Sequence, residues 1–219
     1  MKNRIIFFAL VIFTSPFFMI SCDSGDLVKP VITLTGNADT TISLNANWKE
    51  PGYKAVDDQD GIITTSVVVK GSVNKDSVGV YTLTYTVADA GGNRATQKRT
   101  ITVRNDAYDR IGSYSASIQY TYSGSTSNSA YVDNITCSNT QNNVIIFDMF
   151  GGHKNCHVKA AISKNAITIP AQTLFINNAF ITFATIGTGT ISGTTFNFNY
   201  SETDINSNQE QVVAIYSKN

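Results

Sequence analysis

Charged side chains are scarce in this sequence of 219 residues, and the two signs are balanced. Lysine and arginine together number 16, aspartate and glutamate also number 16, and these four types make up 15% of the chain. The sequence contains no run or patch of basic residues, which a nucleic-acid-binding protein needs in order to neutralise phosphates. The charge pattern therefore argues against nucleic acid as a partner.

Catalytic motifs are lacking as well. The sequence has no nucleophile elbow, no phosphate-binding loop and no His-Glu-x-x-His motif, and it offers only two histidines for acid–base chemistry. The acids of its second half are scattered rather than paired: Asp133, Asp148, Glu202, Asp204 and Glu210. Asp148 lies in an apolar segment and is the acid that we expect burial to perturb. We therefore expect no enzymatic activity.

Cysteine is rare, and the three cysteines are Cys22, Cys137 and Cys156. In an oxidising compartment Cys137 and Cys156 could form a disulfide. The strand order expected below instead places them near opposite ends of neighbouring strands. A strand of eight residues spans about 26 Å, which is far beyond the reach of a disulfide. The sequence leaves the pairing open and favours two free thiols.

Long hydrophobic runs are absent after residue 22, whereas residues 1–21 are dominated by one. Lys2 and Arg4 precede an apolar segment at 5–20, a layout typical of a secretory signal peptide. The segment ends in Met19-Ile20-Ser21-Cys22, which resembles a lipobox, the motif whose cysteine is acylated before cleavage. We therefore predict that residues 1–21 are a signal peptide and that Cys22 is the lipid-bearing first residue of the mature chain. An ordinary signal peptide followed by a chance cysteine is the alternative.

A lipid on Cys22 anchors a protein without any membrane-spanning helix. Residues 22–28 then form a tether, and its acidic stretch Asp23-Ser24-Gly25-Asp26 resembles the tag of surface-exported lipoproteins of Bacteroidetes. In enteric bacteria, an aspartate directly after the cysteine resembles an inner-membrane retention signal instead. The Asn-, Thr- and Tyr-rich composition favours the first resemblance. It implies an outer-membrane protein at the cell surface, or otherwise at the periplasmic face.

Residues 29–104 consist of short alternating segments separated by turn residues, as the strands of a β-sandwich are. In the segment YTLTYTV, Tyr81, Leu83, Tyr85 and Val87 share one face, which we expect to lie in the core. The strings PVITLTG, EPGYKAVDDQDG and GVYTLTYTVADAGGN resemble the bacterial Ig-like domain of surface and secreted proteins, and Tyr81 is similar to the tyrosine corner of Ig-like sandwiches. The resemblance implies a spacer rather than a catalytic domain.

Two turns of this domain are rich in side-chain oxygens. Asp57, Asp58 and Asp60 lie at one turn, and Asp89 and Asn93 lie at a later one. Calcium takes about six to eight oxygen ligands, so these residues are a candidate site for Ca²⁺ as a cofactor. Asp and Asn also close turns by hydrogen bonding to their own backbone, and this is the commoner reason for their presence.

Residues 108–219 follow a short polar break, so we expect the two domains to lie close together with limited freedom. The pattern predicts antiparallel strands at 113–122, 129–137, 143–150, 156–163, 166–170, 180–186, 189–200 and 211–217. An up-and-down set of this size closes into a barrel that either fills itself or holds one small ligand. Segments such as AITIPAQT and GTGTISGTTFNFNY resemble the calycin-type, lipocalin-like barrels of bacterial lipoproteins.

Two groups of residues in this second domain allow two interpretations each. Phe196, Phe198 and Tyr200 face one way, either as a platform on which sugars stack or, more commonly, as part of the core. A second group surrounds a glycine turn and could ligate zinc, although no fourth ligand is near in the sequence: His153, Cys156 and His157. A solvated turn is the commoner interpretation of that group.

The fold class expected is all-β, with an Ig-like β-sandwich followed by an eight-stranded, antiparallel, lipocalin-like barrel. These features predict a non-enzymatic outer-membrane lipoprotein in which the Ig-like domain is a spacer and the barrel binds a ligand, such as a glycan, or a protein partner. One alternative is a periplasmic carrier of a small apolar molecule, which requires a cavity and is excluded if side chains such as Phe147, Phe183 and Phe198 fill the barrel. Another is a structural subunit of a surface complex.

Overall fold

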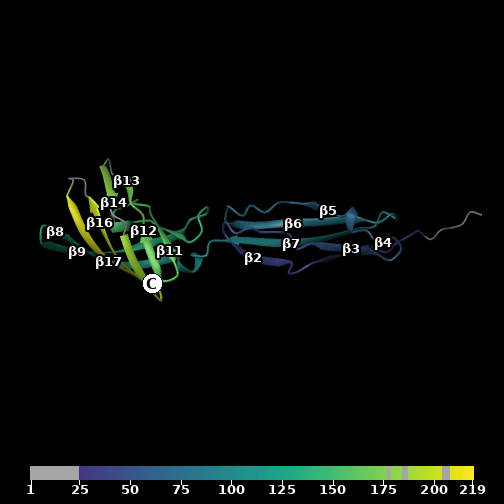
Figure 1. The fold of residues 1–219 in the computed structure, drawn as a ribbon, viewed down its shortest axis with the longest axis horizontal. Helices are drawn as coiled ribbons and strands as arrows, with labels where there is room; N and C mark the ends of the chain where they lie inside the picture. Colours follow the sequence, from purple (N-terminus) through teal and green to yellow (C-terminus); the bar gives the residue numbers. More distant parts are fainter. Residues whose placement is uncertain (1–24, 177–178, 184–186, 204–207) are drawn as a thin grey trace, which may run out of the picture.

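Two β-rich parts lie end to end in the computed structural model, which describes residues 25–176, 179–183, 187–203 and 208–219 (Figure 1). The chain passes through one part completely before it enters the other. Within the described ranges, no helix is long and apolar enough to cross a membrane. The predicted signal peptide and Cys22 lie outside the described residues and stay predictions.

The first part is a sandwich of two sheets. One sheet has the order β1–β3–β4, with the bounds β1 (Val31–Leu34), β3 (Tyr53–Asp57) and β4 (Gly61–Ile62). The other has the order β2–β7–β6–β5, with the bounds β2 (Asp39–Ser43), β7 (Arg94–Arg104), β6 (Gly79–Ala88) and β5 (Val68–Lys70). Strand β2 runs parallel to β7, and a 3₁₀ turn, η1 (Thr64–Ser66), precedes β5. The predicted sandwich is confirmed, and we call it the Ig-like domain.

Alternation along β6 places one face of this strand in the core of the Ig-like domain. Leu83, Tyr85 and Val87 are buried and Tyr81 is partly buried, as predicted. The Tyr81 hydroxyl donates to the carbonyl of Ser77 at 2.9 Å, which is the backbone hydrogen bond of a tyrosine corner. Other strands and loops complete this core with the side chains of Leu44, Ile101 and Val103.

Arg99 on β7 lies in the interior of the same domain, with only 1% of its surface exposed. Its guanidinium is 3.1 Å from Oε1 of Glu50 and donates to the carbonyls of Asn37 (2.5 Å), Thr35 (2.8 Å) and Gly52 (3.2 Å). A buried guanidinium requires such partners because removing it from water is costly. Arg99 therefore ties the segment between β1 and β2, and the segment before β3, to the central strand β7.

The second part is a closed antiparallel barrel. Its described strands follow one another around the wall in the order β8 (Gly112–Tyr122), β9 (Ser125–Cys137), β10 (Val144–Phe147), β11 (Val158–Ser163), β12 (Ala166–Ile169), β15 (Gly187–Ser192), β16 (Thr195–Thr203) and β17 (Gln209–Lys218). Strand β17 pairs with both β16 and β8, which closes the ring. The predicted up-and-down barrel of eight antiparallel strands is confirmed for the described chain.

Two of the strands predicted for this barrel are wrong in detail. The segment 189–200 is not one strand, because it turns at Gly193, whose φ of +57° suits glycine, and forms the hairpin of β15 and β16. The predicted strand at 143–150 ends earlier, since the chain leaves β10 for a short 3₁₀ turn, η3 (Phe150–Gly152). A similar turn, η2 (Tyr108–Arg110), precedes β8.

A separate hairpin replaces the strand predicted at 180–186. Strand β14 (Ala179–Phe183) pairs along its length with β13 (Gln172–Ile176), a strand that the sequence analysis missed. The hairpin joins the ring through one pairing, between Thr182 and Thr203. The number of strands in the ring was therefore predicted correctly, but its members were not.

Asn105 holds the link between the two parts of the molecule. This residue is fully buried, and its Nδ2 donates to the carbonyls of Ser138 (2.8 Å) and Gln141 (2.9 Å). Its Oδ1 accepts from the backbone N–H groups of Ala107 and Asn143, each at 2.9 Å. The loop between β9 and β10 of the barrel therefore wraps around a linker residue.

The same loop also contacts the Ig-like domain directly. The N–H of Val78 donates to the carbonyl of Asn139 at 3.0 Å. Across the same contact, the Asn45 side chain accepts from the N–H of Asn142 (3.0 Å) and donates to the carbonyl of Thr140 (3.2 Å). Hydrogen bonds at several points limit rotation of one part against the other, in line with the short polar break in the sequence.

We expect Arg99→Met to destabilise the Ig-like domain by about 2 kcal/mol, because it leaves Glu50 and three carbonyls without their donor. The cost should stay below that of a fully buried pair, since the Glu50 side chain is 26% exposed. Urea unfolding followed by fluorescence of Trp48, which packs against this core, measures the change. Arg94→Met is the matched control, because Arg94 lies on the same strand and is exposed. An equal loss in both variants would contradict the role of Arg99.

We expect Asn105→Ala to loosen the junction and to cost about 2 kcal/mol, because it leaves buried backbone donors and acceptors unpaired. Small-angle X-ray scattering should show a broader distribution of distances between the two parts than in the unmodified protein. Asn139→Ala is the control, since Asn139 contacts Val78 through its backbone carbonyl. Unchanged scattering in Asn105→Ala would show that the other contacts suffice.

Candidate functional site

Aromatic side chains occupy the interior of the barrel. Phe147, Phe150, Phe198 and Tyr216 each expose 2% of their surface or less. The ring centroid of Phe147 lies 5.1 Å from that of Phe150, 5.1 Å from that of Tyr216 and 5.7 Å from that of Phe198. This described interior is a packed core and gives no support to a carrier of a small apolar molecule. The side chain of Phe183, the third residue named for that test, lies outside the described part.

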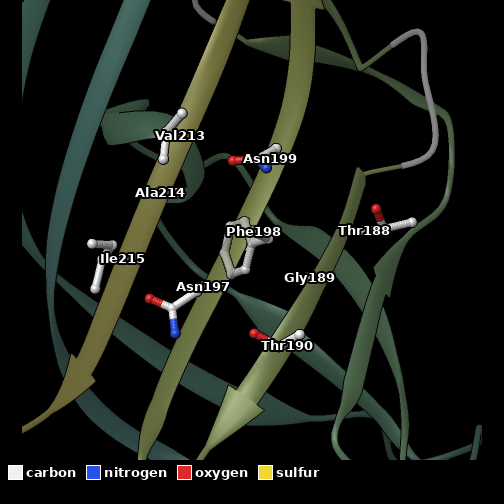
Figure 2. Close-up of a pocket in the computed structure, with 9 residues that line it drawn as sticks. All are labelled: Thr188, Gly189, Thr190, Asn197, Phe198, Asn199, Val213, Ala214 and Ile215. Carbon is white, nitrogen blue, oxygen red and sulfur yellow. The ribbon is translucent and has the colours of Figure 1, made fainter.

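The alternating segment at the centre of β16 separates core from surface. Phe196, Phe198 and Tyr200 are buried, with exposures of 0%, 2% and 4%, so the aromatic row belongs to the core and is not a platform for sugars. Asn197 and Asn199 point to the outer wall of the barrel (Figure 2). The surface chemistry of this strand is therefore amide rather than aromatic.

Two carboxyl groups lie in the barrel interior. Asp133 on β9 and Glu202 on β16 occupy inward positions and are 1% and 2% exposed. Oδ1 of Asp133 accepts from the N–H groups of Asp148 (3.0 Å) and Met149 (2.9 Å). Oε1 of Glu202 lies 3.3 Å from Nε2 of His153. Two carboxyl groups that the sequence analysis described as scattered are thus both buried inside the barrel.

Burial raises the pKa of two groups in the barrel interior, the Asp133 carboxyl and the Cys156 thiol. It raises the pKa of the Asp133 carboxyl, although hydrogen bonds from backbone N–H groups lower it. Burial also raises the pKa of the Cys156 thiol to about 12, helped by the negative charges of Glu202 and Asp133. A thiol that stays protonated at neutral pH is inert. Cys137 and Cys156 are both free in the described chain, so the disulfide that the sequence left open is not formed.

Three tyrosine hydroxyls form hydrogen bonds inside the barrel. The Tyr120 hydroxyl donates to the carbonyl of Gly151, and the hydroxyls of Tyr131 and Tyr216 hydrogen-bond to each other. Burial raises the pKa of Tyr120 and Tyr131 above the usual value, so both remain neutral. This network ties its members to the barrel wall, and such an arrangement supports a structural role.

Asp148 and the suggested zinc ligands lie elsewhere than predicted. The Asp148 side chain is 58% exposed and lies 3.0 Å from Nδ1 of His157, because β10 ends one residue earlier and the chain turns outward. Asp148 is therefore not buried, and the expectation that it lies in the apolar interior is wrong. Of the suggested zinc ligands, His153 contacts Glu202 and Cys156 is buried. Among the described residues, His153, Cys156 and His157 do not assemble into a group of metal ligands.

The period of two would have identified the carboxyl groups that are actually buried. Asp133 lies two residues before Ile135, and Glu202 lies two residues after Tyr200, and both neighbours point into the core. The sequence analysis weighed the apolar character of each segment and did not continue the alternation to the strand ends.

A shallow hollow of about 420 Å³ crosses β15, β16 and β17 on the outer wall of the barrel (Figure 2). A Cβ on Gly189 would lie 2.2 Å from the carbonyl oxygen of Asn197, so this position requires glycine. Val213 and Ile215 rise beside the hollow with exposures of 48% and 44%. All the residues that line it are uncharged: Thr188, Gly189, Thr190, Asn197, Phe198, Asn199, Val213, Ala214 and Ile215.

Carboxylates gather at the end of the Ig-like domain where the chain enters it. Asp57 and Asp58 lie beside Asp26, and one carboxylate oxygen from each falls within 4.8 Å of the others. Asp26 belongs to the predicted tether and was missed, because its acidic stretch was interpreted as an export tag. The hydrogen bond from the N–H of Val28 lowers the pKa of Asp26, but partial burial and the charges of Asp57, Asp58 and Asp89 together raise it above its usual value.

The other three residues of the predicted Ca²⁺ site lie at the same end of the domain. Oδ1 of Asp89 accepts from the N–H of Asn93 at 2.7 Å. Oδ2 of Asp60 accepts from the N–H of Ala90 at 2.6 Å, which links the two turns. Nδ2 of Asn93 donates to the carbonyl of Asp26 at 2.9 Å and so holds the tether. The structure thus brings both turns and the tether together.

Comparisons with known proteins identify the first domain. The family described as bacterial surface protein, Ig-like domain, matches residues 32–103. A search among curated proteins finds no match. The solved structures with similarity include a lipoprotein from Bacteroides thetaiotaomicron, at 17% identity over 85% of this chain and 98% of that one, with a TM-score of 0.37.

Two further solved structures come from Clostridium perfringens ZmpB. One holds CBM51-2 in complex with GlcNAc and INT domains, at 17% identity over 87% of this chain and 44% of that one, with a TM-score of 0.30. The other holds the M60 catalytic domain with CBM51-1 and CBM51-2, at 16% identity over 85% of this chain and 21% of that one, with a TM-score of 0.30. The family match and the strand order together show an Ig-like domain at residues 32–103, followed by a closed antiparallel barrel.

Proposed function

We propose that the protein is a non-enzymatic lipoprotein of the outer membrane, displayed at the cell surface, in which the Ig-like domain is a spacer and the barrel binds a carbohydrate. The observation that carries the proposal is the position of the tether. The described chain begins at the end of the Ig-like domain that faces away from the barrel (Figure 1). A lipid on Cys22 would therefore hold the barrel at the far end of the molecule, away from the membrane.

The junction between the two parts supports the role of a spacer. A spacer directs its cargo only if the connection resists bending, and the buried Asn105 side chain fixes the linker against the loop that follows β9. The match of residues 32–103 to a family of bacterial surface proteins supports display at the surface.

The hollow on the outer wall is the part of the barrel that suits a ligand, because aromatic side chains fill the interior. The amides of Asn197 and Asn199 and the two threonine hydroxyls that line it both donate and accept hydrogen bonds, as sugar hydroxyls do. Val213 and Ile215 provide apolar surface for the C–H faces of a sugar ring. A charged ligand would meet no opposite charge in this lining. A neutral glycan is therefore the ligand class that we propose.

We expect protease added to intact cells to digest the barrel, and we expect Cys22→Ala to release the protein from the membrane fraction. The first result follows from display at the surface and the second from loss of the lipid. Immunoblots with an antibody against the barrel measure both, with a periplasmic protein as the control for cell integrity. Protection in intact cells with digestion after lysis would place the protein in the periplasm. Retention of Cys22→Ala in the membrane fraction would contradict the lipid anchor.

We expect the double variant Asn197→Ala/Asn199→Ala to weaken binding to neutral glycans by about tenfold or more, since each lost hydrogen bond contributes about 1 kcal/mol. Binding to immobilised neutral polysaccharides measures the effect. Asn134→Ala is the matched control, because Asn134 is an exposed amide on β9, two strands from β17. Equal binding by both variants would place the ligand elsewhere, and failure of the unmodified protein to bind any neutral glycan would overturn the carbohydrate assignment while leaving the anchor claim intact.

A further inference from the structure

Two buried carboxylate oxygens at the tether end of the Ig-like domain have no hydrogen-bond partner among the described residues. Asp57 is 3% exposed, and its Oδ1 accepts from the N–H groups of Gln59 and Asp60, each at 3.0 Å, whereas its Oδ2 accepts from no described donor. Asp89 is 8% exposed and shows the same division, with Oδ1 bound to the N–H of Asn93 and Oδ2 unpaired. In each residue, the hydrogen bonds of the turn account for the burial of Oδ1 but not for the burial of Oδ2.

Such oxygens require a positive charge nearby. Removing an ionised carboxylate from water costs several kcal/mol unless a cation or a set of donors replaces the solvent. No lysine or arginine of the described chain forms an ion pair with Asp26, Asp57, Asp58 or Asp89. Oxygens of Asp26, Asp57 and Asp58 instead lie within 4.8 Å of one another, and Asp89 is near enough for its negative charge to act on Asp26. The cluster therefore lacks the countercharge that its burial demands.

The chemistry of the donor set selects the cation. All the candidate ligands are carboxylate oxygens, which hard cations prefer to the nitrogen and sulfur ligands that select zinc or copper. Calcium accepts several carboxylates in irregular geometry, whereas magnesium requires a near-ideal octahedron and keeps most of its water. Ligands that come from a turn and a tether are more easily arranged around calcium.

We infer that one Ca²⁺ ion binds between Asp26, Asp57 and Asp58, beside the unpaired Oδ2 of Asp89, and clamps the tether to the end of the Ig-like domain. The tether is already positioned for this role, because Asn93 holds the Asp26 carbonyl at 2.9 Å and Gly91 leaves room for the Asp26 backbone. Asp26 lies four residues after Cys22. The ion would therefore fix the short segment that precedes the sandwich. This inference stands independently of the proposed function, since the site forms whether or not Cys22 carries lipid.

Calorimetric titration of the purified full chain with CaCl₂, after removal of metal with EDTA, tests the inference. We expect one ion per chain with a Kd of about 10⁻⁴ to 10⁻³ M, the range of extracellular calcium modules, and weaker binding of Mg²⁺. Asp26→Ala should weaken Ca²⁺ binding by about tenfold or more, because one charged ligand is lost. This variant preserves the fold, since Asp26 precedes the first strand. Asp39→Ala is the control, because Asp39 is an exposed acid outside the cluster.

Hydrogen exchange tests the clamp separately from the binding event. The amides of residues 26–28 should exchange more slowly with Ca²⁺ than with EDTA in the unmodified protein and in Asp39→Ala, and at the same rate under both conditions in Asp26→Ala. Absence of Ca²⁺ binding by the unmodified protein at about 10 mM, well above the range of such modules, would overturn the site. Undiminished Ca²⁺ binding by Asp26→Ala would overturn the clamp. Equal exchange rates of the amides of residues 26–28 with Ca²⁺ and with EDTA in the unmodified protein would overturn it as well.

Discussion

The geometry of the molecule depends on one buried amide, that of Asn105. Its side chain uses both its donor and its acceptor atoms to tie the linker to the loop between β9 and β10 of the barrel. Because that loop also meets Asn45 and Val78 of the Ig-like domain, three segments distant in sequence are fixed at one place. Without this arrangement, the barrel would swing on a short polar linker. With it, the position of the tether determines the direction in which the barrel points.

Side-chain volume decides where the barrel can meet a ligand. Inward positions of β8, β10, β16 and β17 carry large aromatic side chains, and an eight-stranded ring has only enough interior to hold them. The buried carboxyl groups of Asp133 and Glu202 also belong to this core, and both act on the neutral Tyr131. The outward positions of β15, β16 and β17 are small or uncharged. A ligand of the barrel would therefore have to bind its outer wall. The same alternation that fills the core sets the chemistry of that surface.

Sequence patterns predicted the features that depend on local repetition. The alternation around Tyr85 and the turn strings marked the Ig-like sandwich, and regular strand spacing marked the closed barrel. They failed where a contact over a long distance decides the outcome. The turn at Gly193 splits what looks like one continuous strand, and Asp148 is exposed because β10 ends early. Asp26 lies beside Asp57 and Asp58, more than 30 residues away, only after the sandwich has folded, so its own neighbours in sequence give no sign of this contact.

The parallel pairing of β2 with β7 has a mechanical consequence. Five residues of β2 pair in register with residues 100–104 of β7, whose end leads into the barrel. Tension between an anchored amino terminus and a captured barrel would pull these strands along their own length in opposite directions. All the hydrogen bonds of the pairing would then share the load at once, whereas strands peeled apart from one end break their bonds singly. A pull of this kind would therefore load the β2–β7 pairing in shear, which this arrangement resists better than peeling.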